Sequence, residues 1–339
     1  MVKALKIAGS EILPGSRMTI QLPIANLYTH TRMDLPIHII HGKKKGPVLF
    51  VSAAIHGDEL NGVEIIRRLL IQKSLKNLRG SLIAIPIVNM FGLIQHSRYL
   101  PDRRDLNRSF PGSPKGALAS RLAHIFMETI VKNSDYALDI HTGAIHRSNL
   151  PQIRANLDDK ETMQLARAFG VPVIINSDIR DGSLREAAAM HGVKTLLYEA
   201  GEALRFDDLS IKAGLNGVMN VMRYLNMLPA SKRKKPNAEP FVARSSSWVR
   251  APHSGVFRNV IKLGERVKLG EKLGSISDPT EIFEEIDFPV ISTRTGIIIG
   301  KTNLPLVNEG DALYHIASFS DSSEVALEVE SFHHDITTE

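Results

Sequence analysis

One stretch of this chain, Gly46 to Arg68, constrains the fold more than any other. Five of the six residues from 48 to 53 are apolar, which predicts a strand that is buried on both faces. The strand pattern stops at His56-Gly57-Asp58-Glu59, and apolar residues with helical spacing follow from Asn61. His56 and Glu59 are therefore expected in a turn at the carboxyl end of a buried strand, where open α/β sheets bind their ligands.

Strand-like and helix-like segments alternate through the first two thirds of the chain, after a pair of edge strands within residues 16–45. The other apolar strands are predicted at 81–88, 136–140, 171–175 and 194–198, and the helices at 117–131, 161–169 and 183–191. This alternation predicts an α/β domain with a mixed, mostly parallel sheet that helices cover on both faces.

The composition changes after residue 228, which predicts a second domain. Residues 1–228 form the expected α/β domain, residues 229–244 a linker with a basic run, and residues 245–320 a smaller all-β domain of the barrel-sandwich kind. Within the β domain, residues 254–276 and 294–316 resemble each other, which indicates a pseudo-symmetric module. Residues 321–339 are expected to form a polar, frayed tail.

The composition excludes several kinds of site. The chain has no cysteine, so a metal must be held by His, Asp or Glu. No stretch of about 18 apolar residues occurs and the start does not resemble a signal peptide, so a soluble, cytoplasmic protein that binds no membrane is the default expectation. The net charge of +6 is not accompanied by aromatic residues among the basic ones, so no nucleic acid is expected as a partner.

Polar residues suited to chemistry follow three of the predicted strands. These are His56 with Glu59, His141, and Glu199. Two histidines and a carboxylate with a fourth position open to water is the arrangement of catalytic zinc sites, and a separate carboxylate can act as acid and base. Asp139 lies two residues before His141 and shares its side of a strand, where it either orients a ligand or substrate or bonds to neighbouring backbone.

An arginine-rich segment, residues 98–108, is the other candidate for binding. Its arginines can pair with Asp102 and Asp105, or they can grip a substrate carboxylate with two hydrogen bonds. Arg103 and Arg104 either reach the site or lie on the surface of the loop, and we favour the surface for both.

Five motifs together resemble the succinylglutamate desuccinylase/aspartoacylase family, whose members are related to the zinc carboxypeptidases. The motifs are His56-Gly57-Asp58-Glu59, Arg98-Tyr99, Asp105-Leu106-Asn107-Arg108-Ser109-Phe110, Asp139-Ile140-His141-Thr142-Gly143 and Tyr198-Glu199. They occur in the order and approximate spacing of that family and cover most of residues 45–200. The module after residue 245 also resembles the family's C-terminal domain. The resemblance implies a zinc carboxypeptidase-like fold.

The resemblance also implies a role for each matching residue. His56, Glu59 and His141 match the ligands of one zinc ion, and Glu199 matches the general acid/base. For the substrate, the matching residues are Arg98, which polarises the scissile carbonyl, Asn107 and Arg108, which bind the α-carboxylate, and Tyr314, which faces the substrate.

The implied activity is that of a zinc-dependent amidohydrolase of amino-acid metabolism, a deacylase that cleaves the linear amide bond of a small N-acyl amino acid. Residues 100–104 make a longer loop than aspartoacylase proper has, so the aspartoacylase substrate does not follow. Two alternatives stay open: carboxypeptidase-like or ester hydrolysis at the same zinc centre, and a non-catalytic binding or carrier protein with a vestigial site. The acyl group, the amino acid and homo-oligomerisation are not determined by the sequence.

Overall fold

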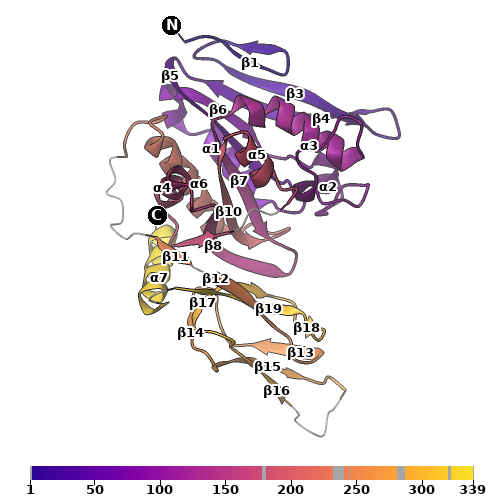
Figure 1. The fold of residues 1–339 in the computed structure, drawn as a ribbon, viewed down its shortest axis with the longest axis vertical. Coiled ribbons are helices and arrows are strands. Elements are labelled where there is room, and N and C mark those ends of the chain that lie inside the picture. The colour runs from indigo at the N-terminus through magenta and orange to yellow at the C-terminus, as the bar shows by residue number, and fades with distance from the viewer. Residues whose placement is uncertain are drawn as a thin grey trace.

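A large mixed sheet runs through the whole molecule, from an N-terminal α/β part to a C-terminal β module (Figure 1). The computed structural model describes residues 2–177, 181–231, 240–243, 245–280, 287–319 and 322–338. The basic run of the predicted linker, residues 232–235, lies outside the described residues.

Parallel strands form the centre of this sheet. They are β6 (Arg79–Ile85), β5 (Lys44–Ala53), β7 (Tyr136–Gly143) and β10 (Lys194–Glu202), in that spatial order. Antiparallel strands extend it, namely β4 (Arg32–His41) and β3 (Arg17–Asn26) beyond β6, and β8 (Arg147–Ala155) beyond β10. The mixed α/β sheet is thus confirmed, and parallel pairs outnumber antiparallel ones in the α/β part, because β8 also pairs in parallel with β9 (Val173–Asn176).

Two layers of helices cover the two faces of the α/β part. The first layer consists of α1 (Asn61–Leu70), α4 (Lys160–Phe169) and α6 (Asp208–Tyr224). The second contains α2 (Met90–Ile94), α3 (Leu118–Thr129), α5 (Leu184–Met190) and a hairpin of β1 (Leu5–Ile7) and β2 (Ser10–Ile12). Single turns of 3₁₀ helix are η1 (Lys73–Asn77), η2 (Leu106–Arg108) and η3 (Val131–Asn133).

The central strand β5 is buried on both faces, as its apolar run predicts. Leu49 and Val51 pack in the core under α1, whereas Phe50 packs in the core under α3. The same alternation in β7 turns Ile140 toward α1 and Asp139 and His141 toward the α3 and α5 layer. The candidate site residues of β7 therefore lie on the α3 and α5 face of the sheet.

The C-terminal β module repeats one pattern of three strands, which confirms the predicted internal similarity. The first copy is β13 (Gly255–Asn259), β14 (Arg266–Val267) and β15 (Lys272–Ser277), and the second is β17 (Gly296–Thr302), β18 (Leu306–Val307) and β19 (Ala312–Ser318). The short strand of each copy pairs with the first strand of the other. Two further strands, β12 (Ser245–Arg250) and β16 (Asp287–Ile291), complete a module with its own apolar core.

Two expectations about the ends of the C-terminal region are wrong. Part of the expected linker is strand β11 (Phe241–Ala243), which pairs in parallel with β9 (Val173–Asn176) of the α/β part. Residues expected to fray form helix α7 (Ser322–Thr338), because Val325 and Val329, four residues apart, are both buried against the sheet. Within the described ranges, no helix is both long and apolar enough to span a membrane.

Candidate functional site

The turn after β5 holds two of the predicted site residues inside the protein. His56 and Glu59 are both buried, although they lie between a strand and the start of α1. Gly57 between them packs directly on the backbone of Gly92, because a Cβ at position 57 would lie 2.0 Å from the carbonyl carbon of Gly92. A residue with a side chain would push the turn away from α2, so glycine at this position keeps His56 and Glu59 in place.

His56, Glu59 and His141 form one buried cluster. Nδ1 of His56 lies 2.7 Å from Oε1 of Glu59, and Nδ1 of His141 lies 2.9 Å from Oε2 of the same carboxylate. The nearest potential ligand atoms of the three residues all lie within 4.8 Å of one another. Two imidazole nitrogens and a carboxylate oxygen at this spacing are a donor set that fits a divalent metal such as zinc.

A second ring of carboxylates orients the two imidazoles. Nε2 of His141 is hydrogen-bonded to Oδ2 of Asp139 at 2.8 Å, and Ser52 Oγ donates to Oδ1 of that aspartate. Nε2 of His56 lies 3.3 Å from Oδ1 of Asp105. The prediction that Asp139 and His141 share a side of the strand is confirmed. Sequence reasoning did not assign Asp105 to His56, although its place in the Asp105-Leu106-Asn107-Arg108 motif was a signal.

The charges of this cluster depend on one another. Burial by itself would raise the pKa of Glu59, but His56 and His141 lower it far below its usual range. Burial by itself would lower the pKa of His141, but Asp139 and Glu59 raise that pKa well above the ordinary value. The pKa of His56 is likewise raised, against its burial, by Glu59 and Asp105. The metal-free cluster therefore favours a carboxylate between two protonated imidazoles.

Arg98 lies beside the cluster and is held by Asp105. Its Nε and Nη2 donate to Asp105 Oδ2 at 3.2 and 2.9 Å, and its Nη1 lies 3.7 Å from Oε1 of Glu59. The Arg98 side chain is partly exposed, although its guanidinium contacts both Asp105 and the buried cluster.

Glu199 lies one strand away from His141 on the same face of the sheet. The two residues are register partners in the parallel ladder of β10 and β7, so their side chains point to the same side. Asn149 Nδ2 donates to Glu199 Oε1 at 2.9 Å, and Arg154 Nε lies 2.5 Å from Oε2. Both partners come from β8, which sequence reasoning did not predict as a strand, so neither was foreseen.

The predicted substrate-binding residues have different surroundings. Asn107 is buried, and its Oδ1 accepts a hydrogen bond from the backbone N of Leu184 at the start of α5. Arg108 is exposed and donates from Nη1 to the Asn107 carbonyl. Arg103 and Arg104 are both exposed, as we favoured for them.

The predicted substrate contact of Tyr314 is wrong. Tyr314 is fully buried in the core of the β module, where its hydroxyl donates to the Leu273 carbonyl and its ring packs edge-on against Phe257. Neighbouring residues of a strand point to opposite faces, and His315, the next residue, lies on the other side, stacked on Trp248. Tyr314 therefore lies on the face of β19 (Ala312–Ser318) that packs into the core of the β module.

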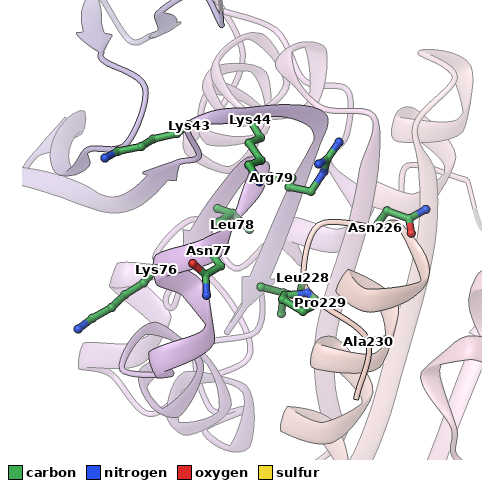
Figure 2. A pocket seen from close by; sticks show the side chains of 10 residues that line it. All are labelled: Lys43, Lys44, Lys76, Asn77, Leu78, Arg79, Asn226, Leu228, Pro229 and Ala230. Carbon is green, nitrogen blue, oxygen red and sulfur yellow. The ribbon is translucent and has the colours of Figure 1, made fainter. Parts of the chain in front are cut away.

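A cavity of about 730 Å³ lies at the opposite end of the central strands, where β5 and β6 begin (Figure 2). Its lining residues are Lys43, Lys44, Lys76, Asn77, Leu78, Arg79, Asn226, Leu228, Pro229 and Ala230. None of the candidate site residues belongs to this lining, so the cavity is separate from the His56–Glu59–His141 cluster.

Comparison with known proteins agrees with the fold and the motifs. One similar protein, the N-alpha-acetyl-L-2,4-diaminobutyric acid deacetylase of Halomonas elongata, is 24% identical over 315 residues, which are 89% of this chain and 91% of that protein. A succinylglutamate desuccinylase/aspartoacylase structure from Rhodobacter sphaeroides superposes with a TM-score of 0.80 at 24% identity, covering 89% of this chain and 96% of that one. The product-bound ectoine utilization protein EutE (DoeB) of Ruegeria pomeroyi gives 0.79 at 24% identity, covering 89% and 95%.

These structural likenesses establish a shared fold. The profile of the succinylglutamate desuccinylase/aspartoacylase catalytic domain matches residues 45–225, which is more than half of the chain and includes every residue of the buried cluster. The chain belongs to the succinylglutamate desuccinylase/aspartoacylase family.

Proposed function

We propose that this protein is a zinc-dependent hydrolase that removes the acyl group from a small N-acyl amino acid. The buried His56–Glu59–His141 cluster carries the proposal, because its donor set fits zinc and it lies in the matched catalytic domain. The name of the Halomonas elongata relative, a deacetylase of an N-acetylated amino acid, supports the substrate class. We also propose that the α/β part, residues 1–228, shares the zinc carboxypeptidase-like fold, with residues 245–320 as a second domain.

In this mechanism, His56, Glu59 and His141 would hold the metal ion. A bound zinc ion would supply Lewis-acid polarisation of the substrate carbonyl and a lowered pKa of water. Glu199 takes a proton from the attacking water and transfers it to the leaving nitrogen. Arg98, whose guanidinium lies 3.7 Å from Glu59, donates hydrogen bonds to the carbonyl oxygen as negative charge develops on it.

We assign the substrate's α-carboxylate to Asn107 and Arg108. Arg108 is exposed, and a guanidinium can grip a carboxylate with two parallel hydrogen bonds. Asn107 Oδ1 already accepts from Leu184 N, so the side-chain amide group of Asn107 is the part that can donate to the substrate. The product of this reaction is a free amino acid together with a carboxylic acid.

The variant Glu199→Gln tests the mechanism directly. It keeps the shape of the side chain but removes the base, so we expect kcat to fall by a factor of about 100 to 10,000 while one zinc per chain stays bound. Metal content and turnover of N-acetyl amino acids are the two measurements. The matched control is Glu128→Gln, which alters an exposed glutamate paired with Lys132. Loss of zinc in Glu199→Gln would instead make Glu199 a metal ligand.

Two alternatives are separated by simple measurements. The same centre can attack a peptide or an ester carbonyl, so a panel of N-acetyl, N-succinyl, dipeptide and ester substrates ranks these activities. A binding or carrier protein with a vestigial site would hydrolyse none of them. Metal analysis of protein purified without added zinc provides the second check, since an intact centre retains its ion.

A further inference from the structure

The carboxylate of Glu199 is held at both of its oxygen atoms. Asn149 donates to Oε1 at 2.9 Å and Arg154 pairs with Oε2 at 2.5 Å. Asn149 is buried, and the side chain of Arg154 is 17% exposed against 20% for Glu199. A hydrogen bond on one oxygen and an ion pair on the other restrict rotation of the carboxylate, which lies beside the strand that carries His141.

Asn149 packs against the C-terminal β module. Its register partner across the β17–β8 ladder is Gly300. A Cβ at position 300 would lie 2.7 Å from Oδ1 of Asn149 and 3.3 Å from Cβ of His315. Gly300 is not among the glycines with positive φ. Glycine is therefore needed here because a side chain would not fit beside Asn149, and not because of the backbone conformation. Any side chain at this position would push Asn149 away from its present place.

A second contact fastens the module to the same strands. Asn303 Nδ2 donates to Ser148 Oγ at 2.6 Å and to Glu202 Oε2 at 2.8 Å, and Asn303 N donates to the His146 carbonyl at 2.7 Å. Ser148 precedes Asn149 on β8, and Glu202 ends the strand that carries Glu199. One asparagine of the module therefore ties together the two strands that form the Glu199 contacts.

We propose that Asn149 and Arg154 are positioning residues for Glu199, and that the β module fixes the place of Asn149 through Gly300 and holds its strand through Asn303. The inference rests on the proposed acid/base role of Glu199. A base that takes a proton from water must keep its distance and angle, and a misplacement of about 1 Å can reduce the rate by a factor of about 100. The module thus contributes to the rate without supplying a group that touches the substrate.

The first experiment separates positioning from binding. In Asn149→Ala and Arg154→Met we expect kcat to fall by a factor of about 10 to 100, with KM for an N-acetyl amino acid and the bound zinc unchanged. Arg154→Lys should recover part of the loss, because an ammonium keeps the charge but not the planar geometry of a guanidinium. The proposal would be overturned if both variants kept wild-type kcat, or if the substitutions changed KM and left kcat unchanged.

The second experiment is a double-mutant cycle across the two parts of the molecule. Gly300→Ala should lower kcat, and the double variant Gly300→Ala/Asn149→Ala should be no slower than Asn149→Ala alone, because Gly300 acts through Asn149. Lys301→Ala, the next residue of β17, is the matched control and should keep wild-type kcat. If the reductions in kcat from the two single substitutions multiply in the double variant, Gly300 acts by another route. That result would contradict this part of the inference.

Glu199→Gln distinguishes a failure of this inference from a failure of the proposed function. If Glu199→Gln retains turnover, Glu199 is not the acid/base, and both proposals fail. If Glu199→Gln is inactive while Asn149→Ala and Arg154→Met keep wild-type kcat, the proposed function stands and the positioning role fails. If the Gly300→Ala protein does not fold, the two β8 variants decide the question. Asn149→Ala and Arg154→Met both shorten a side chain and therefore do not overpack the structure.

Discussion

Both imidazoles of the buried cluster present the same nitrogen to Glu59. Nδ1 of His56 and Nδ1 of His141 face its two oxygens, while each Nε2 faces an aspartate, Asp105 or Asp139. A histidine ligand usually donates its other ring nitrogen to a carboxylate, which sets both its tautomer and its orientation. The arrangement of the two imidazoles between Glu59 and the two aspartates therefore fits a site that could hold a metal ion.

Metal uptake by this cluster should release protons. The pKa values of His56 and His141 are raised, so the metal-free protein carries protons that zinc must displace. We expect zinc affinity to fall as the pH is lowered below the raised pKa values. Calorimetric titration at one pH, in two buffers of different ionisation enthalpy, counts the released protons. A zinc affinity independent of pH between about pH 6 and pH 8 would contradict this expectation.

The same shifts predict how the stability of the metal-free protein depends on pH. A histidine whose pKa is raised in the folded state stabilises the fold below its unfolded pKa and loses that contribution as the pH rises through the folded value. His56 and His141 should therefore favour the metal-free fold on the acid side of that range. Bound zinc reverses the trend, because it requires neutral imidazoles.

Arg108 should act on substrate binding more than on the chemical step. Replacing it with alanine removes hydrogen bonds to a charged group, each worth about 1.5 to 3 kcal/mol, so we expect KM to rise by a factor of about 10 to 100 with a smaller change in kcat. Steady-state kinetics with a free carboxylate and with its methyl ester make the comparison. Arg104→Ala, at another exposed arginine, is the control. An equal effect of Arg108→Ala on both substrates would refute its carboxylate role.

At the scale of elements, the sequence predicted those strands, turns and helices that have a recognisable pattern of apolar residues within their own segment. The strand β5, the turn with His56 and Glu59, and helix α1 follow from one buried run, one turn and one apolar stripe. Strand β8 has no such pattern, because Pro151 interrupts it and polar residues alternate irregularly along it. It is a strand because neighbouring strands pair with it on both sides. Asn149 and Arg154 could not be assigned to the site without that pairing.

The Tyr314 error has the same origin. In a strand, a shift of one residue transfers every side chain to the opposite face. The motif around Tyr314 has no local feature that selects between Tyr314 and His315, and the choice is made by the apolar core that Tyr314 enters. By contrast, the Asp139–His141 relation was predictable, because a spacing of two residues on a strand is enough to define a shared face.

Helix α4 provides a test of capping at the element scale. Asp159 caps its first turn by accepting from Thr162 N at 2.8 Å, and Lys194 Nζ lies 2.8 Å from its other oxygen. Hydrogen bonds from Lys194 and Thr162 lower the pKa of Asp159 to about 2. Asp159→Ala should reduce the free energy of unfolding by about 1 kcal/mol at neutral pH.

The pH dependence of this cap has a defined sign. A carboxyl group with a lowered pKa stabilises the fold above its unfolded pKa, and that contribution disappears as the pH falls toward the folded value of about 2. The difference between wild type and Asp159→Ala in urea unfolding should therefore shrink below about pH 4. Asp158→Ala, at the exposed preceding residue, is the control. A difference that stays constant down to about pH 2 would argue against the carboxylate cap.

At the scale of the whole molecule, one sheet joins the α/β part to the β module. Strand β17 pairs with β8, and β11 pairs with β9. An apolar core spans the junction, with Leu150, Val173 and Ile175 from the α/β part packed against Ile297, Ile299 and Ala317 from the module, and against Val325 and Val329 of α7. The proposed domain boundaries at residues 228 and 245 therefore divide the sequence, but the two parts still share one apolar core.

Residues 1–228 should not fold into a stable monomer by themselves. Removing the rest exposes the edges of β8 and β9 together with the apolar side chains of the junction, and such an edge favours aggregation. We expect the shortened chain to be aggregated or largely unfolded by size-exclusion chromatography and circular dichroism, whereas the full chain is not. A folded, monomeric fragment that still binds zinc would show that the α/β part is independent.

The ladder between β17 and β8 also limits how the two parts of the molecule can move relative to each other. Swinging the module away from the α/β part as a rigid body would break backbone pairing at β8 and the three hydrogen bonds of Asn303 at once. These interactions therefore oppose a hinge motion between the two parts. For the proposed hydrolase, substrate access would therefore depend on the connections at the carboxyl ends of the central strands, among them the turn that carries His56 and Glu59.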